Sequence, residues 1–495
     1  MHVAIDLGAG SGRAILGRFA PGGLFCREVH RFRYPPRQSG GHLRWDWPRL
    51  REGVELGLCA AAAAARELGH EVESVGVDSW AVDYALLDAS GRLLEEPVCY
   101  RDPARTSAME EVLRIVPKEA LYARAGIQFL PFNTVFQLYA HAREGLPTRA
   151  ARLLMIPDLL HHHLAGATSG EYTNASSTGL LDARTRHWDD ALFARLALPR
   201  EIMPRLVEPG TTLGELTPAV RERLSLPAAR VVAPATHDTG SAVAGTPLRP
   251  GWAYVSSGTW SLVGVERTSP LLSPEAAAAS FTNEGGVFGT IRFLKNVMGL
   301  WILESCRKEW AAAGQLLDLD RLLDAASRLD AAPVLVYPDD SRFFNPPSML
   351  EALRSYFRET RQPVVEEPAQ LARVVVDSLA LRYASVLERL QATTGERVAG
   401  LHVVGGGCRN DLLNQATADA TGLPVESGPV EATALGNLSL QAIALGHLGS
   451  LPGAREVIAR HSEIRRFEPD PARRPLWDEL RVRYAPLERP EAPVV

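Results

Sequence analysis

The chain begins with short apolar strands joined by a turn of very small residues, and this pattern constrains the fold more than any other. Residues 2–7 (HVAIDL) form an apolar run that ends in Gly8–Gly12, and residues 13–18 and 25–34 have the composition of two more strands. A second strand, small-residue turn and strand follow at residues 252–266 (WAYVSSGTWSLVGVE). The repeated form predicts an α/β chain with two related halves.

The length of 495 residues also favours two domains, because a single hydrophobic core rarely grows so large. The Gly- and Pro-rich stretch 245–251 is a suitable boundary. We therefore predict an N-terminal domain at 1–244, a C-terminal domain at 245–480 and a proline-containing tail at 481–495. Helical spacing of apolar residues predicts helices, among others, at 50–68, 371–391 and 411–421.

Lysine is scarce, and this excludes two ways of handling ATP. Of 53 basic residues only Lys118, Lys295 and Lys308 are lysine, and none follows a glycine, so the G-K-[ST] of a P-loop is absent. The V-A-I-K, H-R-D and D-F-G strings of protein kinases are absent too. Any ATP site in this chain must use other groups.

Charge, cysteine content and hydropathy further narrow the class of protein to which this chain can belong. A net charge of −5 gives no basis for a bulk nucleic-acid binder, so we expect no nucleic-acid partner. No uncharged apolar run reaches the length of a membrane span. The five cysteines form no C-x-x-C pair, and no signal-peptide pattern is visible. We expect a reduced, cytoplasmic protein that does not enter a membrane.

The first glycine turn suggests a phosphate site. A dinucleotide fingerprint G-x-G-x-x-G would need a third glycine where this chain has Arg13. Asp6, the last strand residue before the turn, would repel a bare pyrophosphate but would help to bind a magnesium–phosphate complex. We predict backbone N–H groups around phosphate, with Mg²⁺ between the phosphate and Asp6. The alternative is an ordinary hairpin whose glycines supply positive φ.

Two later turns extend this interpretation. Residues 256–259 (SSGT) resemble the first turn, and two such hairpins could hold one polyphosphate from opposite sides of a cleft. Gly405, Gly406 and Gly407 stand where a strand passes into a helix, and three glycines let the flat face of an adenine approach the backbone. A tight hairpin and a strand–helix connection without a ligand are the alternatives.

Asp238 is the candidate catalytic group. It stands in a small polar segment, residues 234–240 (PATHDTG), directly after an apolar strand. An aspartate before Thr-Gly is often a helix cap. Its position just before the predicted domain boundary would face a shared cleft, where it could accept the proton of an attacking hydroxyl during phosphoryl transfer.

The order of these motifs resembles the FGGY carbohydrate kinases. The strings are I-D-L-G-A-G-S-G-R at 5–13, H-D-T-G-S-A at 237–242, S-S-G-T-W-S-L at 256–262 and V-V-G-G-G-C-R-N-D at 403–411. The resemblance covers residues 2 to 450. It implies two actin/hexokinase/Hsp70-like (ribonuclease H-like) ATPase domains around a central cleft, with ATP and Mg²⁺ as cofactors and a small sugar as acceptor. A monomer or homodimer is expected.

The resemblance also implies roles for single residues. Asp238 would be the catalytic base, and Thr259 would contact the transferred phosphate. Further implied sugar contacts are Ala81, His237, Thr239 and Asn296, and further implied ATP contacts are Ala9, Gly10, Ser11, Gly12, Arg13, Glu304, Gly405 and Gly406. Related members usually have glycine in place of Ala81 and glutamine in place of Glu304.

Four further strings narrow the resemblance to members that act on L-rhamnulose at O1: residues 77–84 (VDSWAVDY), 100–102 (YRD), 126–134 (GIQFLPFNT) and 294–301 (LKNVMGLW). Kinases for L-fuculose, D-xylulose or another ketose or polyol are the alternatives. A non-catalytic ATPase or sugar sensor would lack the base that Asp238 provides. A dinucleotide oxidoreductase would need the glycine that Arg13 replaces.

Overall fold

The computed structural model describes residues 1–20 and 23–488, and the chain divides into two compact units. The first unit contains Met1–Pro247, Glu266–Phe293 and Glu431–Ser462. The second contains Leu248–Val265, Leu294–Val430 and the stretch that begins at Glu463. The chain therefore leaves the first unit and returns to it twice.

The sheet of the first unit has six strands in the order β13-β14-β6-β1-β2-β3. The predicted N-terminal meander is confirmed as β1 (His2–Gly8), β2 (Ser11–Ala20) and β3 (Gly23–Arg33), which pair antiparallel. Next to β1 lies β6 (Ser74–Ser79), parallel to it, and next to β6 lies β14 (Arg230–Ala233), again parallel. The antiparallel β13 (Thr211–Glu215) closes this edge.

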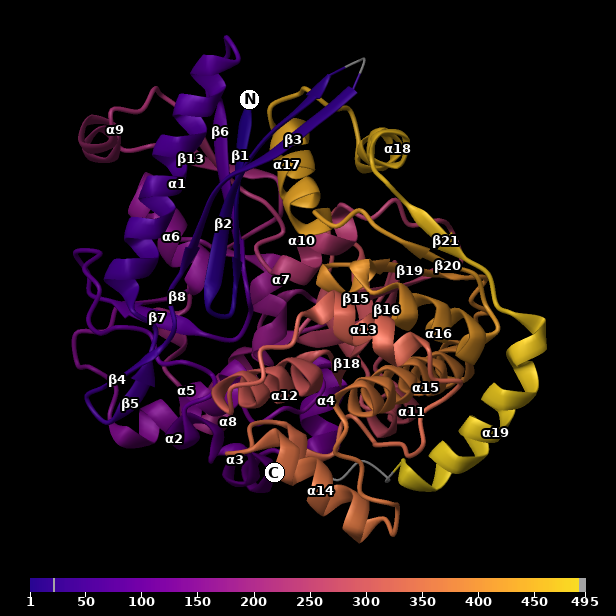
Figure 1. Ribbon diagram of the computed structural model, residues 1–495. Coiled ribbons are helices and arrows are strands. Elements are labelled where there is room, and N and C mark those ends of the chain that lie inside the picture. Colours follow the sequence, from indigo (N-terminus) through magenta and orange to yellow (C-terminus); the bar gives the residue numbers. More distant parts are fainter. Residues whose placement is uncertain (21–22, 489–495) are drawn as a thin grey trace. The chain divides into compact units, whose positions relative to one another are not determined.

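Helices cover this sheet and bury its central strands, including the polar residues Asp6 and Asp78. Residues 2–7 of β1 and all of β6 are buried, as expected for strands covered on both faces. The helix α1 (Trp47–Glu67), capped by the Asp46 carboxylate, packs on β2 and β3. The helix α17 (Ala432–Ala444), drawn in gold in Figure 1, lies against β1, β2 and β6 although it comes from the C-terminal part of the chain.

The helix α10 (Asp238–Ala244) packs closely on α17. A Cβ added to Gly436 of α17 would lie 1.8 Å from the Ser241 carbonyl oxygen of α10, so the two backbones touch. The small residues of α10 permit this approach. The contact holds the helix whose first residue is Asp238.

The second sheet has seven strands in the order β17-β18-β16-β15-β19-β20-β21. Their bounds are β17 (Thr282–Gly285), β18 (Ile291–Met298), β16 (Trp260–Arg267), β15 (Ala253–Ser257), β19 (Leu401–Val404), β20 (Val425–Ser427) and β21 (Arg465–Phe467). The hairpin β15–β16 is antiparallel, while β15–β19 and β19–β20 are parallel. The chain passes between the two units within β16 and β18.

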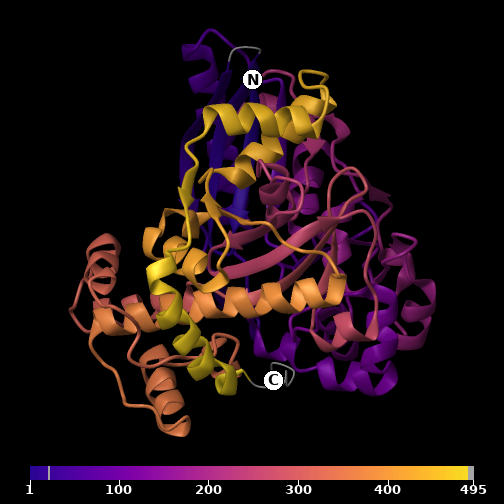
Figure 2. The same cartoon turned by 90° about the vertical axis from the view of Figure 1, so that its right-hand side faces the viewer.

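The longest helix of the second unit is α15 (Pro368–Thr394), the long orange helix in Figure 2. It packs on α16 (Asp411–Thr421), which follows the three glycines. The predicted helices at 50–68, 371–391 and 411–421 are thus confirmed. The other helices of this unit are α12 (Trp301–Ala312), α13 (Leu319–Ser327), α14 (Met349–Glu359) and α19 (Arg474–Tyr484).

The remaining elements of the first unit surround its sheet. The strands are β4 (Arg37–Ser39), β5 (His42–Arg44), β7 (Tyr84–Leu87), β8 (Arg152–Met155), β9 (Gly170–Glu171), β10 (Leu181–Asp182), β11 (His187–Trp188) and β12 (Leu206–Val207). The helices are α2 (Pro103–Thr106), α3 (Met109–Ile115), α4 (Lys118–Ala125), α5 (Thr134–Glu144), α6 (Ile156–Ala165), α7 (Tyr172–Ala175), α8 (Asp190–Leu196), α9 (Pro218–Leu224), α11 (Pro274–Ala278) and α18 (Leu451–His461).

Two expectations about the ends of the domains have partial counterparts in the structure. The predicted division into functional domains at residue 244 stays a prediction. The compact units differ from it, because residues 266–293 and 431–462 pack with the first unit. Of the predicted tail, residues 481–488 are described, and Tyr484 is buried. Residues 489–495 lie outside the described part. No helix in residues 1–20 and 23–488 has the length and apolar character needed to cross a membrane.

Candidate active site

Three parallel strands of the first unit end side by side and bring together those predicted sugar and phosphate residues that lie in this unit. The β6 end is tied to its neighbours because Ser79 N donates to Thr236 O (2.8 Å) and Trp80 N donates to Leu7 O (3.2 Å). The carboxyl ends of parallel strands are the usual place for ligand sites in α/β sheets. The glycine hairpin, the loop that carries Ala81 and the segment that carries Asp238 therefore lie at one edge of this sheet.

The first glycine hairpin is held from one side by Tyr34. Its hydroxyl donates to Gly8 O (2.5 Å) and contacts Ser11 O (3.0 Å), and its backbone N–H donates to Gly10 O (3.1 Å). The turn carbonyls are thus paired with the protein. Ala9 and Ser11 at the tip are exposed, as a turn that receives a phosphate requires.

The Arg13 side chain points to carboxylates rather than to the exposed tip. It contacts Asp6 Oδ2 and Glu431 Oε2 (2.5 Å for the latter). Burial opposes the charge of Arg13, but Asp6 and Glu431 outweigh burial and raise its pKa. A role for Arg13 in ATP binding therefore rests on its backbone N–H or on a rearrangement of this ion pair.

Three carboxylates gather near the hairpin. Asp6 and Asp78 are opposite each other in the β1–β6 pair, and Asp238 interacts electrostatically with both. Asp78 is fully buried and accepts from Asn437 Nδ2 (2.6 Å) through Oδ2. Burial, and then the negative charge of Asp6, raise the pKa of Asp78 well above its usual value.

This donor set fits a magnesium ion that arrives with its phosphates. Mg²⁺ is usually bound by one or two carboxylates together with phosphate oxygens and waters. Asp6 and Asp238 offer such carboxylates, and their mutual repulsion would be relieved by a cation. In the described ranges no three His, Cys, Asp or Glu side chains form a cage of their own.

Asp238 is held through one of its two carboxylate oxygens. Oδ1 accepts from Thr239 N (2.6 Å) and contacts Thr239 Oγ1 (3.3 Å), and His237 Nε2 lies 3.5 Å away. The contacts from Thr239 N, Thr239 Oγ1 and His237 Nε2 all reach Oδ1, and none of them reaches Oδ2. Burial raises the pKa of Asp238, His237 opposes this, and Asp6 adds to the increase. The side chain is 31% exposed, so a ligand can reach it.

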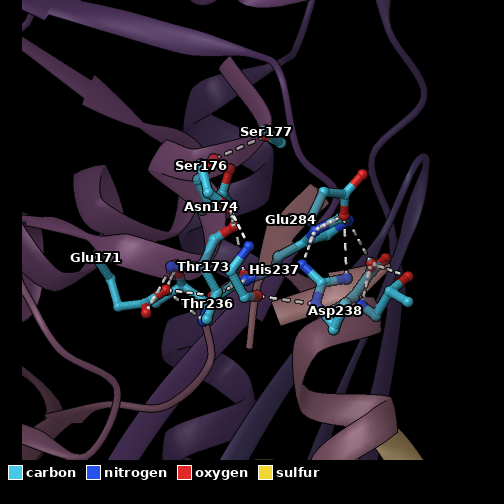
Figure 3. Close-up of polar contacts among 12 residues, drawn as sticks. Glu171, Thr173, Asn174, Ser176, Ser177, Thr236, His237, Asp238 and Glu284 are labelled. Carbon is cyan, nitrogen blue, oxygen red and sulfur yellow. Dashed lines mark hydrogen bonds and ion pairs between the residues drawn. The ribbon is translucent and has the colours of Figure 1, made fainter. Parts of the chain in front are cut away.

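A buried glutamate holds the segment before Asp238 (Figure 3). Glu171 accepts from Thr236 N (2.9 Å) and Thr236 Oγ1 (2.7 Å), and also from Thr173 N (2.8 Å) and Thr173 Oγ1 (2.5 Å). Thr173 Oγ1 in turn accepts from His237 N (3.2 Å). Glu171 is fully buried, and its four donors compensate for this. They fix the backbone that presents His237 and Asp238.

A second buried group fixes the His237 ring (Figure 3). Arg292 Nη2 lies 3.0 Å from His237 Nδ1, and Arg292 Nε donates to Gly285 O (2.9 Å). Glu284 Oε2 lies 3.1 Å from Arg292 Nη1 and 3.2 Å from His237 Nδ1. Burial opposes the ionisation of Glu284, yet Arg292 and His237 hold its pKa below the usual value. Glu284 is therefore a carboxylate at neutral pH.

The loop with Ala81 has an unusual backbone. Asp83 N donates to Ala81 O (3.0 Å), which closes a γ-turn, and its central residue Val82 has a φ of 70°. A β-branched residue rarely adopts this conformation, and such strain persists only where the surroundings impose it. Thr134 Oγ1 donates to Val82 O (2.8 Å). Ala81 itself is only partly buried.

In the second unit, the predicted phosphate hairpin lies against the start of α12. Gly299 N and Leu300 N donate to Thr259 O (3.1 Å) and Gly258 O (2.9 Å). Thr259 is exposed at the tip of the hairpin. Glu304 lies in the first turn of α12 and forms an exposed ion pair with Arg307 (2.7 Å).

The three glycines of the second unit differ in their surroundings. A Cβ at Gly405, whose φ is 80°, would lie 2.8 Å from Ser257 O, and one at Gly407 would lie 2.0 Å from Ser257 Oγ. A Cβ at Gly406 would meet no atom within 4 Å. The glycine loop thus packs on the β15–β16 hairpin and leaves open space at Gly406, as a nucleotide site requires.

Asn296, the remaining predicted sugar contact, lies in β18 of the second unit and is partly buried. Its neighbour Lys295 is buried. The roles of all these residues stay predictions.

Sequence reasoning missed Glu171, Thr173, Glu284 and Arg292, which hold the Asp238 segment. A signal was present in two of them. Glu284 interrupts an otherwise small and uncharged string, residues 282–287 (TNEGGV), and Arg292 interrupts the apolar string 291–294 (IRFL). A charged residue in a buried strand is rare unless it is paired, so the two could have been proposed as partners.

Comparisons with known proteins agree with this geometry. Residues 1–245 match the N-terminal domain of the FGGY family of carbohydrate kinases, and residues 253–445 match its C-terminal domain. A rhamnulokinase of Bacteroides thetaiotaomicron is 42% identical over 97% of this chain and 98% of its own. A rhamnulokinase of Enterococcus faecalis is 43% identical over 92% of both chains.

Solved structures show the same fold at low identity. A ligand-bound xylulose kinase from Lactobacillus acidophilus has a TM-score of 0.79 at 15% identity and covers 98% of both chains. Plasmodium falciparum glycerol kinase with ADP has a TM-score of 0.74 at 16% identity and also covers 98% of both chains. The predicted actin/hexokinase-like fold is confirmed, and the chain belongs to the FGGY family of carbohydrate kinases.

Proposed function

We propose that this carbohydrate kinase transfers the γ-phosphoryl group of ATP to O1 of L-rhamnulose, which gives L-rhamnulose 1-phosphate and ADP. The observation that carries the proposal is the identity of 42–43% to rhamnulokinases over more than nine tenths of the chain. The proposed enzyme is cytoplasmic.

The sugar is proposed to bind at the strand ends of the first unit. His237 and Thr239 contact Asp238 there and offer an imidazole and a hydroxyl to the sugar, and Ala81 offers a methyl group. Asn296 is the proposed contact from the second unit. The methyl group of Ala81 would narrow the proposed sugar site relative to a glycine at this position, so the acceptor must leave room for it.

Asp238 is the proposed base. Oδ2 accepts the O1 proton while the O1 electron pair attacks the γ-phosphorus, and the bond from this phosphorus to the bridging oxygen breaks, so ADP leaves with that electron pair. The donors on Oδ1 support this assignment, because they hold one oxygen and leave the other for the sugar. Proton acceptance at a positioned carboxylate is the usual role of the base in phosphoryl transfer.

ATP is proposed to contact the exposed tips of both glycine hairpins, with its adenine at Gly405 and Gly406. Ala9–Arg13 and Thr259 would donate to phosphate oxygens, and Glu304 would lie near the nucleotide. A magnesium ion, when bound with ATP near Asp6, neutralises the negative charge of the phosphates.

The acceptor is tested by measuring ADP release with ATP and Mg²⁺ across a panel of L-rhamnulose, L-fuculose, D-xylulose and several polyols. We expect kcat/KM to be highest for L-rhamnulose, and ³¹P and ¹³C NMR of the product to place the phosphate on O1. A higher kcat/KM for another panel member would show that this compound, and not L-rhamnulose, is the acceptor, while the proposed kinase activity would stand. ADP release that does not depend on any sugar would contradict the proposed function.

A further inference from the structure

The contact between Arg292 and His237 determines where the imidazole proton is. A guanidinium nitrogen carries only donors, so the 3.0 Å contact from Arg292 Nη2 requires a lone pair on His237 Nδ1. A proton on Nδ1 would place two N–H groups against each other in a site where Arg292 is fully buried. The neutral ring then carries its proton on Nε2.

Glu284 is the competing partner for Nδ1, and its geometry is less suitable. Its Oε2 lies 3.2 Å from Nδ1, but in the described part of the chain no hydrogen bond of acceptable geometry reaches this oxygen. The carboxylate lies equally close to Arg292 Nη1 and balances the buried guanidinium charge. Glu284 therefore supports Arg292, and Arg292 contacts the ring.

We infer that Arg292 is a positioning residue that holds His237 in the tautomer with the proton on Nε2. The Nε2–H then faces Asp238 Oδ1 and, when sugar is bound, offers a donor to a hydroxyl or carbonyl oxygen of the sugar. With the two Thr239 donors, it stabilises the ionised form of Asp238 through Oδ1 and leaves Oδ2 to take the proton. The effect on the protonation of Asp238 during catalysis rests on the proposed function, whereas the inference about the His237 tautomer does not.

The tautomer is read by long-range ¹H–¹⁵N NMR of the ¹⁵N-histidine-labelled full chain without ligands, at about pH 8, where an ordinary histidine is neutral. The His237 signals are identified by their loss in His237→Gln. We expect an unprotonated Nδ1 and a protonated Nε2. A protonated Nδ1 with an unprotonated Nε2, or two protonated nitrogens, would overturn the inference whether or not the protein phosphorylates any sugar.

Matched variants test the role of Arg292. Arg292→Lys keeps a buried cation whose nitrogen only donates, so the tautomer should be retained. The double variant Arg292→Met with Glu284→Met removes both charges together and leaves neither side chain with a donor for Nδ1, so its His237 should lose the preference for Nε2–H. Retention of the wild-type signals in a folded double variant would contradict the role of Arg292.

A pair of His237 variants gives a kinetic test that does not depend on the folding of Arg292 variants. The amide nitrogen of glutamine can take the place of Nε2, whereas that of asparagine reaches only the place of Nδ1. We expect the kcat of His237→Gln to be on the order of tenfold higher than that of His237→Asn, because one hydrogen bond to a charged group stabilises the transition state by about that factor. An equal or higher kcat for His237→Asn would contradict the inference.

Discussion

Gly406 has open space around it, whereas the glycines on either side are packed against Ser257. Gly405 needs its positive φ, and Gly407 has no room for a Cβ. Glycine at position 406 is therefore not required by the fold in the described structure. A bound nucleotide would explain why the position has no side chain.

Gly406→Val should leave the thermal midpoint of unfolding close to that of the wild type and raise the KM for ATP on the order of tenfold, the effect of losing about 1.4 kcal/mol of binding. The KM for the sugar should stay nearly constant. Gly407→Ala is the matched control, because its Cβ clashes with Ser257 and should lower stability instead. An unchanged KM for ATP in Gly406→Val would place the adenine elsewhere.

Single residues were predictable from the sequence where a local string carries the signal. Asp238 was found as a candidate base because a small polar string follows an apolar strand. Arg292 was not found, because its partner His237 is 55 residues away and no local pattern links the two. The contact of Arg13 with Glu431 was also not predictable, since Glu431 is 418 residues away in the sequence, whereas Asp6 lies directly opposite Arg13 in the predicted hairpin.

The close packing of α10 on α17 determines where α10, and therefore the candidate base Asp238 at its first residue, lies. Gly436 of α17 touches the Ser241 carbonyl of α10, and Gly245, directly after α10, lies equally close to the Ala432 carbonyl. A side chain at either glycine would force the helices apart. Because α10 begins at Asp238, its displacement would move the carboxylate.

Gly436→Ala should lower the free energy of unfolding by about 1–3 kcal/mol, the usual cost of overpacking, and should also lower kcat. Gly453→Ala in α18 is the matched helical control. Its Cβ would have only ordinary contact with Ser450, so stability should stay the same or rise by up to about 1 kcal/mol. Urea unfolding and ADP release measure both effects. Equal stability of Gly436→Ala and the wild type would refute this account of the helix contact.

The two strand–turn–strand segments were predicted from apolar runs and small residues, and both are confirmed. The helix α17 packs on the sheet of the first unit. Its partner was not predictable, because helix packing joins segments that are far apart in the sequence. The γ-turn at Val82 was not predictable either, since a valine does not indicate a positive φ.

At the scale of the molecule, the two sheets share one pattern: an antiparallel hairpin, β1–β2 or β15–β16, whose first strand is followed by two parallel strands. This agreement is why the repeated hairpin allowed the fold class to be predicted. The discontinuity of the units was not predictable from a single boundary near residue 245. The return of residues 431–462 to the first unit depends on the apolar face that β1 and β2 present to α17.

The stability of the first unit should depend on pH through His161, which links α6 to the sheet. Its Nε2 accepts from Val77 N (3.2 Å), and burial lowers its pKa to about 3. The unfolded chain, with an ordinary pKa near 6.5, binds a proton between these values and the folded chain does not. Stability is therefore lost as the pH falls below about 6.5, by about 1.4 kcal/mol per pH unit.

His161→Gln keeps an acceptor for Val77 N and cannot be protonated. Urea unfolding from about pH 7 to pH 4.5 should show a smaller loss of stability for this variant than for the wild type, with the difference between the two growing by about 1.4 kcal/mol per unit. Parallel pH profiles would show that His161 does not contribute in this way.

The central claim is that Asp238 removes the sugar proton during phosphoryl transfer. The most direct test compares the kcat of the wild type and Asp238→Asn with L-rhamnulose, ATP and Mg²⁺, with Asp190→Asn as an exposed control in the same unit. Asparagine keeps an oxygen for Thr239 N but is not a base. We predict that Asp238→Asn keeps the thermal midpoint and loses kcat by about 10²–10⁴-fold, whereas Asp190→Asn keeps kcat. A folded Asp238→Asn protein with near-normal kcat would contradict the claim.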